Sequence, residues 1–147
     1  MARVLQLRKG TTQENNIFIG ALGELTYDTD RGDLRIHDGD TRGGFSIPTV
    51  VSYISPTFQN DYKWFRVYSD GWMEQGGKIV ATSSATVTLT APMIDNNYPI
   101  FLQPSNAEGY QSNWVVRANS ATTTNFVIHS DYAGETTIFW EVKGRWK

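Results

Sequence analysis

Short stretches in which hydrophobic and polar residues alternate dominate the chain, and no segment shows a sustained helical period. Residues 24–28 and 33–37 alternate cleanly, which places the hydrophobic side chains of each stretch on one face. Residues 29–32 between them predict a hairpin turn in which Gly32 supplies a positive φ. Residues 1–47 are therefore predicted to form a compact module of three or four short strands.

A second series of short alternating stretches begins at residue 62. Turn signals rich in Gly, Ser, Asp and Asn separate these stretches, and Gly76-Gly77 is one of the expected turns. Several short strands at this spacing predict an antiparallel β-sandwich over residues 62–147. The expected strands cover residues 64–68, 72–75, 78–82, 85–90, 100–103, 114–119, 125–130 and 137–143.

Residues 48–61 connect the two patterned regions. Pro48 and Pro56 interrupt regular structure. The connector is nevertheless apolar rather than solvated, because four large hydrophobic residues follow Pro48 closely. We expect it to be an extended arm that packs on neighbouring chains.

The first module is close to the size at which a single chain cannot bury enough apolar surface to fold alone. It contains no cysteine, so no disulfide stabilises it. Association with further copies is the remaining common solution. The small size alone therefore predicts a module built across a subunit interface.

Composition and charge exclude several classes of function. The formal net charge is −2, with 13 basic and 15 acidic residues and no basic stripe, so no nucleic-acid partner is expected. The absence of cysteine removes thiolate zinc sites and cysteine nucleophiles. No apolar run approaches the roughly 18 residues of a membrane span, so no membrane insertion is expected.

The first module carries a family resemblance in four short motifs. They are Leu5–Thr12 (LQLRKGTT), Gly20–Asp30 (GALGELTYDTD), Leu34–Gly39 (LRIHDG) and Gly43–Phe45 (GGF). In this order they resemble the amino-terminal module of bacteriophage tail-fibre and tropism-determinant proteins. The resemblance covers about residues 4–47. It implies an intertwined, trimeric β-prism, in agreement with the oligomer expected from size.

The second region is similar to the carboxy-terminal knob domains of phage tail fibres. The similarity rests on Tyr68–Gly77 (YSDGWMEQGG), on the segment from Ala91-Pro92 to Tyr98, and on Phe139–Gly144 (FWEVKG). It implies a trimeric β-sandwich head. Long tail fibres place a shaft between base and tip, whereas only residues 48–61 separate the two modules here. This favours a short fibre, a knob, or a decoration on head, collar or baseplate.

The two resemblances together imply a homotrimer in a phage virion, made in the bacterial host cytoplasm. Its expected partners are other virion proteins (of tail, baseplate, collar or capsid) and a glycan or protein on the host surface. The predicted trimer interface comprises Leu5, Leu7, Leu25, Leu34, Ile36, Phe45, Val50, Val51, Tyr53 and Ile54.

Five aspartates crowd one stretch of the first module: Asp28, Asp30, Asp33, Asp38 and Asp40. Oxygen clusters of this kind can bind hard cations, but the spacing of an EF-hand and its terminal glutamate are missing. Aspartate side chains also hydrogen-bond to nearby backbone in turns. We therefore predict a role in turns and no metal site.

The chain lacks a recognisable catalytic constellation. His37 and His129 lie in different modules, and either a solvent-facing or a core position is expected for each, although His37 could meet its own copies on a threefold axis. Glu74 with Asp70, or Glu135 with Glu141, could be imagined as a glycosidase pair, but nothing in the sequence places them together. No enzymatic activity and no cofactor are expected.

Aromatic residues are abundant in the second region, and most are predicted to be core. Two lie instead in polar loops: Tyr110 within residues 105–113, and Tyr132 within residues 130–134. A rigid aromatic among Asn, Ser and Gln is typical of recognition loops, although plain solvated turns have the same composition. The predicted receptor-binding residues are Tyr110, Asn113 and Tyr132.

The sequence thus predicts an all-β virion protein: a homotrimeric short tail fibre or fibre knob that attaches to a host receptor, for which a glycan is one candidate. The alternative is a virion decoration, head-fibre, collar or baseplate adaptor that binds no receptor.

Overall fold

The computed structural model describes residues 6–105, 115–132 and 134–147. Contacts divide the chain into an amino-terminal unit, Met1–Val51 with Tyr68–Asp70, and a carboxy-terminal unit, Ser52–Val67 with Gly71–Lys147. Both units are built mainly of strands, as predicted. The domain limits expected at residues 47 and 61 stay predictions. The helices of the described residues are too short and too polar to cross a bilayer.

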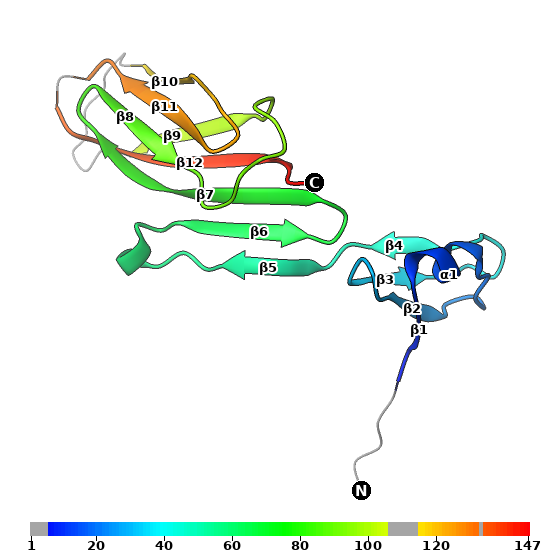
Figure 1. The fold of residues 1–147 in the computed structure, drawn as a ribbon. Coiled ribbons are helices and arrows are strands. Elements are labelled where there is room, and N and C mark those ends of the chain that lie inside the picture. The colour runs from blue at the N-terminus through cyan, green and yellow to red at the C-terminus, as the bar shows by residue number, and fades with distance from the viewer. Residues whose placement is uncertain (1–5, 106–114, 133) are drawn as a thin grey trace, which may run out of the picture. The chain divides into compact units, whose positions relative to one another are not determined.

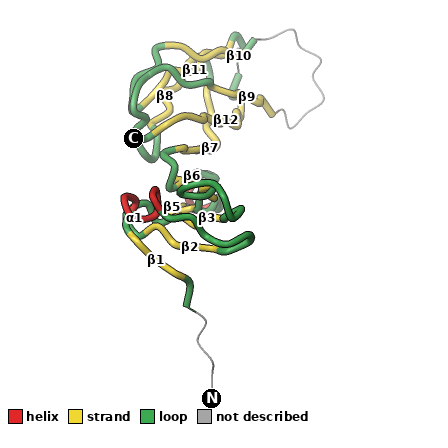
Figure 2. The backbone as a smooth tube through the Cα atoms, turned by 90° about the vertical axis from the view of Figure 1, so that its right-hand side faces the viewer, coloured by secondary structure: helices red, strands yellow, loops and turns green. Residues whose placement is uncertain are grey.

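The amino-terminal unit is a four-stranded sheet in the order β1-β2-β3-β4, with a short helix beside β1 and β2 (Figure 2). Strand β1 is parallel to β2, and the other pairs are antiparallel. The hairpin predicted between β2 and β3 is confirmed, and its Gly32 has a φ of +71°. The elements are β1 (Arg8–Gly10), α1 (Thr12–Ile17), β2 (Leu25–Asp28), β3 (Asp33–Ile36) and β4 (Phe45–Ile47).

Helix α1 was not expected, because its six residues are too few to show a helical period. Reciprocal hydrogen bonds at its start explain its formation. The Glu14 N–H donates to Thr11 Oγ1 over 3.3 Å, and the Thr11 N–H donates to Glu14 Oε2 over 2.7 Å. This capping box satisfies two backbone donors that a helix start otherwise leaves unpaired.

The carboxy-terminal unit contains two sheets, which Figure 1 shows as separate layers. One has five strands in the order β5-β6-β7-β12-β9, and the other has three in the order β10-β11-β8. Every strand pair with a recorded register in this unit is antiparallel, as predicted. The elements are β5 (Val50–Ile54, whose first two residues belong to the amino-terminal unit), η1 (Phe58–Asn60), β6 (Trp64–Tyr68), β7 (Trp72–Ala81), β8 (Ser84–Thr88), β9 (Ile100–Ser105), β10 (Val116–Asn119), β11 (Asn125–Ser130) and β12 (Thr136–Arg145).

One hydrophobic core lies between these two sheets. Phe126 and Ile128 come from the three-stranded sheet, and Met73, Ile138 and Trp140 come from the five-stranded sheet. Phe126 meets Trp140 edge to face, with ring centroids 5.7 Å apart. Since Phe126, Met73 and Ile138 are fully buried, the packing of this core fixes which face of the five-stranded sheet points outward.

Strand β7 runs unbroken through Gly76-Gly77, so the turn predicted there is wrong. Two tryptophans explain the glycines. A Cβ on Gly76 would lie 2.6 Å from Trp64 Nε1, and a Cβ on Gly77 would lie 3.1 Å from Trp140 Cζ2. The glycines therefore allow close approach on the two faces of the strand rather than a change of direction.

The neighbouring Gln75, at the end of the strand expected over residues 72–75, is a buried strand residue. Its Oε1 accepts from the Thr90 N–H over 2.8 Å and from the Ala91 N–H over 3.2 Å, and its Nε2 donates to the Ala91 carbonyl over 2.7 Å. Buried polar groups are costly unless they are paired. Gln75 therefore holds the segment after β8 against β7.

Candidate functional site

In the sheet of the amino-terminal unit the polar face is buried and the hydrophobic face is exposed, which is the reverse of an ordinary half-buried sheet. Along β2 and β3 the polar side chains Thr26, Asp28, Asp33 and Arg35 are buried. The hydrophobic side chains between them point to the other face, because side-chain direction alternates along a strand. The unit is therefore polar inside and apolar outside on this sheet.

The outward side chains form two cross-strand rows. One row is Leu25, Ile36 and Phe45, and the other is Tyr27, Leu34 and Ile47, as the strand register pairs them. We call these six residues the apolar face. Exposed fractions reach 55% at Phe45, and large hydrophobic side chains that share one open face mark an interaction surface.

The predicted trimer-interface residues fall into three groups. Leu25, Leu34, Ile36 and Phe45 lie together on the apolar face. Leu7 and the β5 residues Val50, Val51, Tyr53 and Ile54 are exposed as well, and Leu5 lies outside the described residues. Tyr27 and Ile47 were missed, although alternation in the sequence places them on the same face.

An ion pair holds the polar side of this sheet together. Arg35 Nη2 donates to Asp28 Oδ2 over 2.7 Å, and both side chains are almost fully buried. Arg35 Nη1 also donates to Asn16 Oδ1 and to the Gly43 carbonyl. Burial opposes ionisation of Asp28, but the hydrogen bonds from Arg35 and Thr12 outweigh it and hold its pKa below the ordinary value.

His37 is buried on the same side and is engaged at both ring nitrogens. Nδ1 accepts a hydrogen bond from the Gly20 N–H over 3.2 Å. Nε2 therefore carries the ring proton and donates it to Thr26 Oγ1 over 3.1 Å. Of the positions expected for His37, the structure selects the core, where it is neither solvent-facing nor free to meet its copies on a threefold axis.

Two of the five clustered aspartates, Asp28 and Asp38, serve turns as predicted. Asp30 instead accepts from the Thr12 N–H, and Asp33 accepts from the Ser46 hydroxyl. Asp28 Oδ1 accepts from the N–H groups of residues 30 and 31, and Asp38 Oδ1 accepts from those of residues 40 and 41. Hydrogen bonds from the hydroxyl and N–H of Thr41 lower the pKa of Asp38 to about 2. In the part of the chain that the structure describes, no group of three or more His, Asp or Glu side chains could hold a metal ion.

Tyr110 and Asn113 lie outside the described residues, whereas Tyr132 is described and is 38% exposed. The strands that flank both predicted recognition loops end side by side. Ser105 at the end of β9 pairs with Thr137 in β12, and the Asp131 N–H donates to the Val115 carbonyl over 3.2 Å. The described ends of both loops therefore lie at one end of the two-sheet unit.

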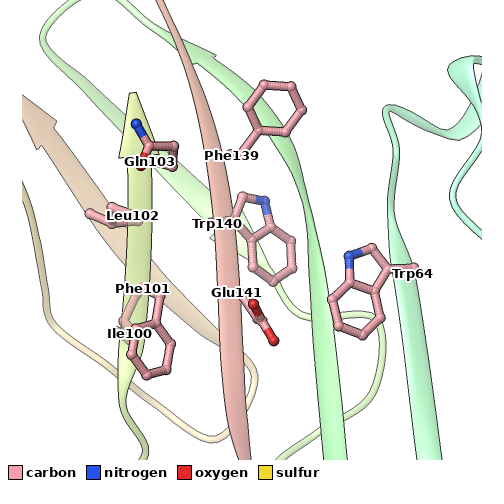
Figure 3. A pocket seen from close by; sticks show the side chains of 8 residues that line it. All are labelled: Trp64, Ile100, Phe101, Leu102, Gln103, Phe139, Trp140 and Glu141. Carbon is pink, nitrogen blue, oxygen red and sulfur yellow. The ribbon is translucent and has the colours of Figure 1, made fainter. Parts of the chain in front are cut away.

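A pocket of about 580 Å³ opens on the outer face of the five-stranded sheet (Figure 3). Strand register brings its exposed side chains together: Phe101 of β9 pairs with Glu141 of β12, and Gln103 pairs with Phe139. On the other side of Glu141, Gly76 of β7 pairs with Trp64 of β6. Figure 3 shows the Glu141 carboxylate between the rings of Trp64 and Phe101.

This pocket was missed because the aromatic residues were assigned mostly to the core. That assignment is wrong: of the described aromatic side chains in the carboxy-terminal unit, Tyr98, Phe126 and Trp140 are in the buried core. Phe101 and Phe139 are 52% and 41% exposed. The sequence does contain a signal for the pocket, because its outward side chains alternate with inward hydrophobic residues. These outward residues are Phe101 and Gln103 in one strand and Phe139 and Glu141 in the other.

Two known sequences or families of sequences are similar to this chain. Residues 5–41 match the family described as the major tropism determinant N-terminal domain. The chain is 27% identical over 135 residues to the tail fiber receptor-binding protein of Bordetella phage BPP-1. That match covers 84% of this chain and 35% of the phage protein, so the chain spans well under half of its relative.

Two solved structures share the fold. A carboxy-terminal part of the R2 pyocin fibre of P. aeruginosa matches with a TM-score of 0.58 and 17% identity, over 98% of this chain and 37% of that one. An N-truncated R2-type pyocin tail fibre matches with a TM-score of 0.51 and 19% identity, over 66% of this chain and 39% of that one.

At these identities the pyocin structures support the fold alone, whereas the family match and the phage relative support descent. The chain is therefore similar to a phage tail-fibre receptor-binding protein over most of its length, and its residues 5–41 match the major tropism determinant N-terminal domain.

Proposed function

We propose that this protein is a homotrimeric receptor-binding component of a phage tail fibre, which attaches the virion to the surface of a host cell. The observation that carries this proposal is the similarity to a tail fiber receptor-binding protein over 84% of the chain. The mechanism is adhesion rather than catalysis. A glycan or a protein on the host surface is the receptor.

The apolar face supports the assembly part of the proposal. A monomer would leave both of its hydrophobic rows in water, and closed symmetric association removes such a surface from solvent without leaving an open end. Leu25, Leu34, Ile36 and Phe45 form the centre of the proposed interface. The proposed form of the trimer is β-prism-like, with the exposed residues of β5 as an arm on neighbouring copies.

The shared position of the loop ends supports the recognition part. Tyr110, Asn113 and Tyr132 are the proposed receptor contacts, and the strands that lead to both loops lie at one end of the unit. Three copies would present three such ends on one rigid body. Binding through several weak sites then gives high avidity without a tight single contact.

Binding of fluorescently labelled protein to a panel of bacterial strains tests this function. We expect retention on at least one strain, and a loss of about tenfold or more for Tyr110→Ala and Tyr132→Ala, since removal of an aromatic anchor commonly costs more than about 1.4 kcal/mol. Trp146→Ala is the matched control, because Trp146 is an aromatic residue with the same 38% exposure as Tyr132 and lies outside both loops.

Unchanged binding by both loop variants would refute the proposed contacts. Absence of binding to every strain would favour the alternative function, a virion decoration or adaptor without a receptor.

A further inference from the structure

We propose that the pocket on the outer face of the five-stranded sheet binds one uncharged pyranose ring of a surface saccharide. This inference rests on the proposed function, because it names the chemistry of a receptor, but it places that chemistry on the sheet rather than in the loops. The ring would lie above Glu141, between Trp64 and Phe101.

The backbone register builds the pocket on rigid elements. Trp64, Gly76, Glu141 and Phe101 follow one another across four adjacent strands, as the three strand pairs record. Gly76 contributes no side chain, so the indole of Trp64 leans over it, and a Cβ there would lie 2.6 Å from Trp64 Nε1. The missing side chain lets the indole lie against β7, where it forms one wall of the pocket.

The chemistry of the exposed side chains matches a sugar. Phe101 and Phe139 are 52% and 41% exposed, although aromatic side chains gain most from burial. Aromatic rings offer an apolar surface with a negative face, which suits the C–H groups on one side of a pyranose. Glu141 and Gln103 supply the few polar groups that fix orientation in such pockets, and both can accept hydrogen bonds from hydroxyl groups.

The surroundings disfavour a peptide as the occupant. The pocket lies on the face of the sheet, over the inner strand β12 and the edge strand β9. A peptide that paired with the open edge of β9 would lie in the plane of the sheet, beside the pocket rather than on its face. Recognition inside the pocket therefore depends on side chains, and side chains can form hydrogen bonds with the hydroxyl groups of a sugar.

The charge of the pocket favours an uncharged sugar. Glu141 lines the pocket, whereas its partner Lys143, with Nζ 3.1 Å from Glu141 Oε1, does not. A uronic or sialic acid would bring its carboxylate close to Glu141, and like charges at short range repel. The ion pair keeps the Glu141 carboxylate in place as an acceptor for sugar hydroxyls.

Nuclear magnetic resonance of the full-length protein tests this site through the Trp64 indole N–H signal, which a Trp64→Phe variant assigns. The probes are the methyl glycosides of glucose, galactose, mannose and rhamnose. We expect at least one to shift the signal saturably, with a dissociation constant of about 1–50 mM, as befits a single small ligand that makes few contacts. Methyl glucuronide should bind at least about fivefold more weakly than methyl glucoside.

Two variants and a control locate the site. Phe101→Ser and Glu141→Ala should each weaken binding about tenfold, the effect of losing one well-placed contact. Val80→Ser is the control, since Val80 is 48% exposed on the same strand as Gly76 and lies outside the pocket lining. The proposal is overturned if none of the four glycosides shifts the signal, or if Phe101→Ser binds as the unaltered protein does.

The two proposals fail separately. If the protein binds to cells but no sugar shifts the Trp64 indole N–H signal, the proposed sugar site is refuted and the receptor-binding function stands. A saturable shift without retention on any strain would keep the pocket and remove the function.

Discussion

Single side chains in the amino-terminal unit show which contacts a sequence can reveal. The turn role of Asp38 was predictable, because its hydrogen-bond partners are only two and three residues away. Arg35 has Asn16 among its partners and His37 has Gly20, and both of these partners are distant in sequence. Nothing local marks such residues as buried, since charged residues and histidines are mostly expected at the surface.

Acid should weaken the amino-terminal unit through its low-pKa carboxylates. A carboxyl group whose pKa is lower in the folded than in the unfolded chain stabilises the fold above its unfolded pKa, and this contribution is lost as the pH falls through the folded value. For Asp38 the window runs from the ordinary 3.8 down to about 2. We expect the free energy of unfolding, from urea titrations read on amide signals of β2 and β3, to fall across this window.

The variant Asp38→Asn separates this effect from general acid denaturation. It should be less stable than the unaltered protein at neutral pH and show a shallower fall between pH 4 and 2, because one titrating group is gone. Asp40→Asn is the control with the same change in charge, since Asp40 gives the turn its N–H rather than an acceptor. Parallel acid curves for the unaltered protein and Asp38→Asn would contradict the assignment.

At the level of elements, local sequence patterns predicted most of the strands. They failed where contacts with distant parts of the chain determine the structure. The strand predicted at residues 125–130 coincides with β11, because alternation and turn signals bound it on both sides. Gly76-Gly77 has the composition of a turn, yet Trp64 and Trp140 close on it from other strands. The pocket was overlooked for the same reason, because its side chains come from four strands that only the register brings together.

A single methyl group in β7 should disturb both sheet and pocket. In Gly76→Ala the new Cβ would meet Trp64 Nε1 at 2.6 Å and the Trp140 carbonyl oxygen at 2.7 Å. Backbone oxygen cannot move aside cheaply, so we expect a loss of about 1–3 kcal/mol in the free energy of unfolding, measured by urea titration with tryptophan fluorescence.

Val80→Ala is the matched change in the same strand and on the same face, where the side chain is 48% exposed. It should alter the free energy of unfolding by less than about 1 kcal/mol. If Gly76→Ala were as stable as this control, Trp64 would not be held against the strand.

At the level of the whole molecule, the apolar face is the feature that bears on whether the protein is a monomer or an oligomer. Small size predicted an interface, and alternation in the sequence predicted which side chains share a face. The polar interior was not foreseeable, because the same alternation fits a sheet with its hydrophobic side turned inward. The inverted burial of β2 and β3 shows which of the two arrangements the chain adopts.

The central residue of the apolar face offers a direct test of assembly. Leu34 lies between Tyr27 and Ile47 in its row, and in Leu34→Asp a carboxylate would be buried without a partner on association, which is strongly unfavourable. We expect light scattering after size exclusion to give a mass near three chains for the unaltered protein and near one chain for this variant.

Leu22→Asp controls for the loss of a leucine and the added charge. Leu22 is 83% exposed and lies outside the strands. This variant should keep the mass of the unaltered protein, and a folded trimer of Leu34→Asp would remove Leu34 from the interface.

The ion pair of Arg35 with Asp28 and the hydrogen bonds of His37 all lie within one chain, and this has a kinetic consequence. If the proposed trimer forms, each copy can close its own polar network first, so that folding of the unit precedes association. Refolding after dilution from urea should then show an early phase whose rate is independent of protein concentration. A later phase should become faster as the protein concentration rises, because it depends on collisions between copies that are already folded.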